Sequence, residues 1–279
     1  MSKPAITITP IDGLTIARRG TAILAASQNA LSLHEGDLSP VTYFPRANIW
    51  AGLHLPTTSR THCPHKGDAA YFDAAGEHDG AWIYYDPKDK VAAIADHVAY
   101  VREVAAVETI ALPELDPDAK AIIDYWFDEI PPAKQFQEDA TIDATIKERF
   151  GAHHARAAGG HLSRWQNHPV GALALLILLD QFSRNLNRGS EKAFAHDAQA
   201  RKIAGLMIQR GFDLALPAAQ RAFVYIPFMH SEELDDQNTA VSLFEDRLPG
   251  SPNMAYALSH RHDIHRHGRF PYRDEALGR

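Results

Sequence analysis

The chain has 279 residues, 45% of them hydrophobic and 23% charged, which is enough for two modest domains with separate cores. Its net charge of −7 disfavours nonspecific nucleic-acid binding, which depends on basic residues that displace counterions. The longest apolar run is about half the length that a bilayer crossing requires, and the amino terminus lacks a signal-peptide pattern, so we expect a cytoplasmic protein with no membrane partner.

The first third of the chain predicts short strands. Hydrophobic and polar residues alternate there in several stretches, nearly all separated by turn residues, as in half-buried strands. A helix is predicted over residues 91–107. We therefore expect a small β-rich domain over residues 1–110. Its predicted strands are residues 5–9, 14–17, 31–34, 41–44 and 81–85.

Residues 60–68 are expected to form a polar loop that carries the densest chemistry of this domain. Cys63 is the single cysteine of the chain, which excludes an intrachain disulfide and fits a reducing compartment. Nearby cations such as Lys66 and His62 favour a reactive thiolate, so Cys63 is a candidate nucleophile. At least as good an alternative is a cysteine that packs as a small hydrophobic residue.

A zinc site is the weaker alternative for the same loop. It would combine Cys63, His62 and His65 with a distant His54 or His78. The paired short spacings of structural zinc sites are missing, and we predict no metal here.

The sequence around this loop resembles a known family. The core Thr61-x-Cys63-Pro64-x-Lys66-Gly67 and its flanking strands resemble domain of unknown function family 427, which is also labelled nucleotidyltransferase-like. The likeness covers residues 6–107 and implies a compact β-rich fold without an established reaction. Carried over by position, its motif residues here are His34, Tyr43, Thr61, Cys63, Lys66, Gly67, Tyr71 and Trp82. Of these, our candidate catalytic residues are Cys63 and Lys66, and our candidate ligand-binding residues are His34, Tyr43, Thr61 and Tyr71.

Residues 111–118 are expected to be a linker, and residues 119–279 an all-α domain, so the predicted fold class is α+β. Asp116 before Pro117 is typical of a helix start, and Gly211 of a helix end. The expected architecture is an array of antiparallel helical hairpins. The predicted helices are residues 119–127, 141–150, 170–185, 191–210, 217–229, 232–244 and 253–267.

The most apolar segment of the chain leads directly into charged residues. Residues 170–179 are followed by Asp180 and, one helical turn later, Arg184. Charged groups in apolar surroundings cost several kcal/mol unless they are paired and hydrogen-bonded. We therefore expect Asp180 and Arg184 to be partners and to recruit further polar groups.

Three further polar clusters interrupt apolar helix faces: residues 194–197, 227–233 and 260–279. Pro227 should kink or end its helix and aim His230 and Ser231 at a cavity. His230 beside Glu232 is then a candidate acid or base. His230 and Glu233 also have the spacing of a shared metal site, but two-metal helical bundles need two such pairs, so a hydrogen-bonded cluster is favoured.

The carboxy-terminal tail is the most basic stretch of this acidic protein, and arginine side chains suit carboxylates and phosphates. The leading hypothesis is an enzyme or binding protein that holds a small anionic molecule among basic residues, with Asp180 orienting Arg184. Two alternatives are ion pairs that only stabilise the fold and a scaffold whose helices bind a peptide. Any cofactor and the oligomeric state stay open. The proposed ligand-binding residues are Asp180, Arg184, His230, His260, Arg269 and Arg273.

Four motifs of this half, at residues 121–127, 180–185, 227–232 and 268–279, resemble domain of unknown function family 924. The likeness spans residues 119–279 and implies an all-helical fold related to tetratricopeptide hairpins, again without a settled activity. This chain departs from the family pattern in its tail. It has His267 in place of Phe, Tyr272 in place of His and Asp274 in place of Asn.

Overall fold

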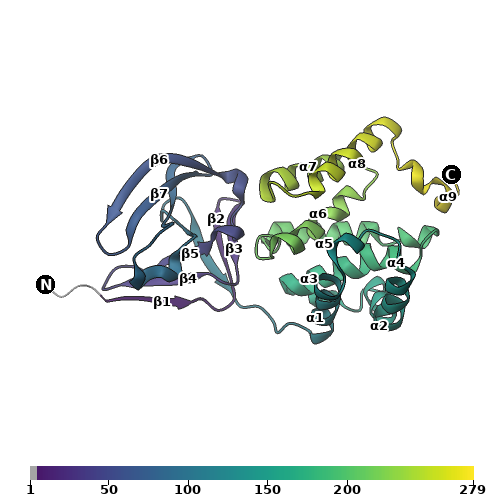
Figure 1. Ribbon diagram of the computed structural model, residues 1–279, viewed down its shortest axis with the longest axis horizontal. Coiled ribbons are helices and arrows are strands. Elements are labelled where there is room, and N and C mark those ends of the chain that lie inside the picture. Colours follow the sequence, from purple (N-terminus) through teal and green to yellow (C-terminus); the bar gives the residue numbers. More distant parts are fainter. Residues whose placement is uncertain (1–4) are drawn as a thin grey trace. The chain divides into compact units, whose positions relative to one another are not determined.

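The computed structural model describes residues 5–279, which divide into two compact units. The β-rich unit comprises the residues up to Leu112 together with Leu214–Pro217, and the helical unit comprises Pro113–Asp213 and Ala218–Arg279. Figure 1 shows the strands gathered in the first unit and the helices α1–α9 in the second. The predicted α+β fold class is confirmed.

Within residues 5–112, ten strands pair into two antiparallel sheets. They are β1 (Ile6–Pro10), β2 (Leu14–Arg19), β3 (Ala22–Ser27), β4 (Leu31–Glu35), β5 (Val41–Pro45), β6 (His54–Cys63), β7 (Gly67–Ala74), β8 (Glu77–Ile83), β9 (His97–Tyr100) and β10 (Ala106–Ile110). The larger sheet has the order β1-β4-β5-β9-β8-β7-β6, and the smaller one β10-β2-β3. Short 3₁₀ turns join some strands: η1 (Arg46–Asn48), η2 (Ala51–Leu53) and η3 (Asp89–Ile94).

The five predicted strands are confirmed, with shifted ends, but two other expectations for this unit are wrong. The predicted helix over residues 91–107 is η3 followed by β9 and β10. Val98 on β9 pairs with Phe44 and Ile83 on neighbouring strands, a tertiary pairing that local periodicity does not report. The predicted loop over residues 60–68 is mostly the β6–β7 hairpin. Because β6 is a sheet edge with most side chains exposed, its sequence lacks the alternation of a half-buried strand.

The helical unit contains the helices expected from the sequence. They are α1 (Pro117–Asp124), α2 (Ala140–Ala158), α3 (Pro169–Leu176), α4 (Ser183–Leu186), α5 (Asp197–Arg210), α6 (Ala218–Met229), α7 (Leu234–Arg247), α8 (Asn253–His267) and α9 (Asp274–Leu277). Shorter turns are η5 (Pro132–Lys134), η6 (Ser163–Asn167), η8 (Glu191–Ala193) and η9 (Pro271–Arg273). The predicted ends at Asp116 and Gly211 are confirmed, because the Asp116 side chain accepts from the backbone N–H of Asp118 and Gly211 adopts φ 73°.

The centre of this unit is a helical run that is buried on all sides. It continues from α3 through the π-helical segment η7 (Ile177–Phe182) into α4, and a second π-helical segment, η4 (Tyr125–Glu129), follows α1. Residues 171–183 are all buried. Helices α1, α5 and α6 pack against α3. Throughout residues 5–279, each helix is too short or too polar to traverse a lipid bilayer.

Candidate functional site

Asp180 lies in the π-helical segment η7, at the centre of the helical unit, with its side chain 2% exposed. Its Oδ1 accepts from Arg184 Nη1 at 2.9 Å and from His230 Nδ1 at 2.7 Å, and its Oδ2 accepts from Gln181 Nε2. The predicted pairing of Asp180 with Arg184 is therefore confirmed. Single π-helical turns recur at functional sites, because the extra residue redirects the side chains that follow.

Asp197 and Arg273 complete a group of charged side chains that we call the Asp180 cluster. It consists of Asp180, Arg184, Asp197, His230 and Arg273. Arg184 donates through Nη1 and Nη2 to the two oxygens of Asp197, each at 2.9 Å. Arg273 Nη1 donates to Asp197 Oδ2 at 3.4 Å, and its Nη2 donates to the His230 carbonyl at 3.0 Å. Two carboxylates thus balance two guanidinium groups, which offsets much of the cost of burying them.

Aromatic rings hold the two guanidinium groups of the cluster. Phe194 lies 4.5 Å from the Arg273 guanidinium carbon and 5.5 Å from that of Arg184, measured to the ring centroid. Phe270 contacts Arg273 at 4.6 Å. The sequence marked residues 194–197 as polar but did not single out Phe194 or Asp197. Beyond this polar cluster the sequence held no signal for Asp197, because the helix predicted over residues 191–210 placed it in a helix interior, whereas it begins α5.

His230 directly follows α6, which ends two residues after Pro227 as the sequence predicted. The carbonyls at this end have partners, since Gln237 Nε2 donates to the Met229 carbonyl at 2.8 Å and to the Ser231 carbonyl at 2.6 Å. Because His230 Nδ1 faces the Asp180 carboxylate, the neutral ring carries its proton on Nδ1 and its lone pair on Nε2. The ring hydrogen bond found for His230 among the described residues is on Nδ1, and the side chain is 13% exposed.

The surroundings set the protonation of these groups. Burial alone would raise the pKa of Asp180, but the charge of Arg184 and the contact with His230 outweigh it and lower that pKa to about 2. Burial, followed by repulsion from Arg184, lowers the pKa of His230. The pKa of His260 is lowered to about 4, chiefly by burial and to a smaller extent by electrostatic repulsion from His230 and Arg273. At neutral pH the carboxylate is therefore ionised and both imidazoles are uncharged.

His260 lies beside the Asp180 cluster. Its ring centroid is 6.3 Å from that of His230 and 5.1 Å from that of Phe270. One buried nitrogen here, Arg273 Nε, has no hydrogen-bond partner among the described residues. Such atoms cost free energy until a partner arrives, so this side of the cluster has unused hydrogen-bonding capacity.

Two predicted site residues contact the tail instead of the cluster. The exposed Arg269 donates to Asp274, with its Nη2 2.9 Å from Oδ2. Glu232 Oε1 accepts from the Phe270 backbone N–H at 2.9 Å and from Arg279 Nη2. The carboxylate that contacts His230 is therefore that of Asp180, and Glu232 anchors the carboxy-terminal tail.

In the β-rich unit, Tyr43, Lys66 and Tyr71 line one cavity of about 380 Å³. Thr61 reaches this group indirectly, because its Oγ1 is 2.9 Å from the Tyr71 hydroxyl. His34 is exposed, and its Nε2 is 3.0 Å from Ser32 Oγ. The sequence-based set is thus only partly assembled.

The partly buried Cys63 packs against the hydrophobic core beneath this cavity. The two cations expected to activate its thiol have carboxylate partners instead. Lys66 Nζ donates to Glu35, and His62 Nδ1 lies 2.6 Å from Asp68 Oδ1. These contacts support the packing interpretation of Cys63 over the nucleophilic one.

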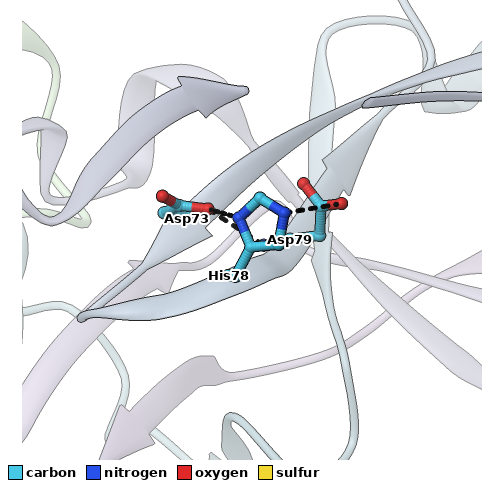
Figure 2. A group of neighbouring side chains, drawn as sticks. All are labelled: Asp73, His78 and Asp79. Carbon is cyan, nitrogen blue, oxygen red and sulfur yellow. Dashed lines mark hydrogen bonds and ion pairs between the residues drawn. The ribbon is translucent and has the colours of Figure 1, made fainter. Parts of the chain in front are cut away.

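Figure 2 shows His78 between Asp73 and Asp79, in the hairpin of β7 and β8. Its Nδ1 is 2.7 Å from Asp73 Oδ1, and its Nε2 is 3.6 Å from Asp79 Oδ2. Asp79 has φ 52° and accepts from Thr57 Oγ1 at 2.6 Å. The three ligand atoms lie within 4.8 Å of one another, but structural zinc sites use four ligands and His78 is 75% exposed. The group is explained by its own hydrogen bonds, and we assign no metal to it.

The zinc set considered from the sequence is not brought together. His54 is buried, with Nδ1 2.7 Å from the Trp50 carbonyl and Nε2 2.9 Å from the Tyr100 hydroxyl. His62 pairs with Asp68, and His78 with Asp73. Each imidazole therefore has its own partners at a different place in the unit.

The second unit is a helical array that encloses an Asp–Arg–His cluster, and sequence comparison gives its family. Residues 122–279 match the family described as bacterial protein of unknown function (DUF924), and the chain belongs to this family. Residues 10–111 match domain of unknown function 427 (DUF427). Both resemblances inferred from the motifs are confirmed.

A solved structure is also similar to this chain. It is the structure of a protein of unknown function from Agrobacterium tumefaciens, with 38% sequence identity and a TM-score of 0.55. The match covers 58% of this chain and 90% of the other. No curated protein matches the sequence.

Proposed function

We propose that the helical unit binds a small anionic metabolite at the Asp180 cluster, and that His230 contacts this molecule and exchanges a proton with it. One observation carries the proposal. The 2.7 Å hydrogen bond to Asp180 fixes the His230 ring through Nδ1, and Arg184, which donates to the same Asp180 oxygen, is close enough for its charge to lower the pKa of this imidazole. An imidazole oriented by a buried carboxylate is a common acid–base arrangement.

The charge balance of the cluster predicts how an anion would bind. Asp180 and Asp197 already neutralise Arg184 and Arg273, so a bound anion needs one more positive charge. Protonation of His230 supplies it. Without a bound anion this imidazole is uncharged, because burial and then repulsion from Arg184 lower its pKa. A bound anion reverses that repulsion and raises the pKa of His230. Binding is therefore expected to take up a proton and to tighten as the pH falls.

The enclosure of the cluster supports a small ligand over a peptide. A helical scaffold presents its recognition groups in an open concave groove. Here the side chains of Asp180, His230 and Arg184 are 2%, 13% and 20% exposed. Side chains buried to this extent cannot line an open groove, which favours a small molecule over a peptide segment.

The test is a thermal-shift and calorimetric screen of the full chain with inorganic phosphate, succinate and citrate. Binding should be accompanied by proton uptake, seen as a heat that depends on the ionisation enthalpy of the buffer. His230→Asn keeps an N–H donor toward Asp180 but lacks Nε2, so it should weaken binding by about tenfold or more while the protein stays folded.

The matched control is His168→Asn. His168 caps α3 by accepting from the Val170 backbone N–H, and asparagine preserves that bond. This variant should bind the anions like the wild type. The proposal is wrong if none of the three anions shifts the melting temperature, or if His230→Asn binds them as tightly as the control does.

A further inference from the structure

A second candidate site lies in the β-rich unit and is independent of the proposed function. It is the cavity of about 380 Å³ introduced above, which β4, β5, β7 and β8 line together with the segments that join them. Its volume lies within the range of small-molecule sites. Four aromatic residues and one ion pair dominate its wall: Tyr43, Tyr71, Trp82, Tyr84, Glu35 and Lys66.

The ion pair is the polar feature of this cavity. Glu35 ends β4, and Lys66 lies in the turn between β6 and β7, 31 residues later. Both side chains are only 13% exposed. Their mutual bond uses one of three ammonium donors and one carboxylate oxygen, so a further acceptor can bind Lys66 and a further donor can bind Glu35.

The aromatic part of the wall is uncharged. Burial raises the pKa of Tyr43 to about 12 and also raises the pKa of Tyr84, so both phenols stay protonated. Tyr71 and Trp82 lie directly opposite each other in the pairing of β7 with β8. These rings offer apolar faces to a flat molecule.

We propose that this cavity binds a planar, uncharged heteroaromatic molecule whose edge carries a neighbouring hydrogen-bond donor and acceptor, as in a lactam. The carbonyl of the lactam accepts from Lys66, and its N–H donates to Glu35. A charged ligand fits less well because an anion attracted by Lys66 meets Glu35, and a cation attracted by Glu35 meets Lys66. The proposed selectivity therefore follows from the neutral pair, and the affinity from the aromatic wall.

The probe is 2-quinolinone, a two-ring lactam, measured by calorimetry and by ligand-observed saturation-transfer NMR with the full chain. N-methyl-2-quinolinone keeps the acceptor and ring area but lacks the donor, and 2-naphthoate tests for an anion site. 2-Quinolinone should bind at least about tenfold more tightly than either of them, because losing a hydrogen bond to a charged group costs about 1.5–3 kcal/mol.

The protein variant combines Glu35→Leu with Lys66→Met. Removing both charges leaves no unpaired charge behind, and replacing a buried pair by apolar residues is often tolerated. This variant should keep its circular dichroism spectrum and lose the preference for 2-quinolinone over its N-methyl derivative. Lys88→Met is the control, because Lys88 donates to the Pro64 carbonyl at an exposed position and does not line this cavity.

Three outcomes would overturn the proposal. The first is that 2-quinolinone does not bind. The second is that the paired variant retains the preference of the wild type, and the third is that 2-naphthoate binds best. None of these outcomes affects the proposed anion site, which is tested with different ligands and with a variant in the helical unit.

Discussion

The substitution Asp180→Asn tests whether the Asp180 cluster is held together by its buried carboxylate. Both oxygens of Asp180 accept hydrogen bonds, Oδ1 from Arg184 and His230 and Oδ2 from Gln181. An amide of the same shape must turn its NH₂ group toward one of these donors. It also leaves the cluster with an uncompensated positive charge at a position that is 2% exposed.

Removing one partner of a buried ion pair costs about 3–5 kcal/mol. For a domain of this size, a loss of that order lowers the melting temperature by roughly 10 °C. Urea and thermal unfolding followed by circular dichroism at 222 nm measure this directly, because the helices of eight or more residues lie in the helical unit.

The control for Asp180→Asn is Asp143→Asn. Asp143 has a comparable number of partners, Arg188 and Asn185, but its side chain is 21% exposed and that of Arg188 is 32% exposed. Exposed pairs contribute about 0–1 kcal/mol. If both substitutions lower the free energy of unfolding by the same amount, burial does not amplify the interaction and the reasoning is refuted.

Three further predictions concern stability. The folded-state pKa of His260 is about 4, below the ordinary 6.5, so the unfolded chain takes up a proton first as the pH falls and stability is lost between pH 6.5 and 4. With solvent screening allowed for, the loss in the free energy of unfolding is about 2 kcal/mol. A His260→Gln variant whose stability depends on pH in the same way as that of the wild type would contradict this prediction. Gly171→Ala places a Cβ 2.6 Å from the Trp165 carbonyl oxygen and should lower the free energy of urea unfolding by about 2 kcal/mol. Gly205→Ala in α5, which has open space around it, should raise that free energy by up to about 1 kcal/mol. Equal effects of the two substitutions would refute the packing argument. Asp116→Ala removes the cap of α1 and should lower the free energy of unfolding by about 1 kcal/mol. An unchanged thermal unfolding curve would argue against the cap.

The sequence predicted local features well where a single element carries the signal. Residues 170–179 are apolar on every side, which indicated a buried helix, and the spacing of Asp180 and Arg184 predicted their contact. The helix start at Asp116 followed from a side chain that can accept from a free backbone N–H, and the helix end at Gly211 from a left-handed backbone conformation that few other residues adopt as readily. The alternation in residues 31–34 and 41–44 likewise predicted half-buried strands.

The failures share a physical cause, which is dependence on partners distant in the chain. Strand β6 is polar because it is an edge, and β9 is a strand because β5 and β8 lie on either side of it. Glu232 follows His230 closely in the sequence, yet the tail takes up its carboxylate. Side-chain pairing of this kind is decided by three-dimensional neighbours, which sequence spacing does not record.

By itself, the sequence determined that a strand-rich half precedes a helical half, and that a charged pair lies inside the most apolar helix. Periodicity and the cost of burying charge are properties of local sequence, so they are readable without a structure. Only the tertiary structure decided that Asp197 and Arg273 close the cluster, that Asp180 is the carboxylate on His230, and that Glu35 meets Lys66 in an aromatic cavity. Those contacts join residues 13 to 76 positions apart, and chain topology alone brings them together.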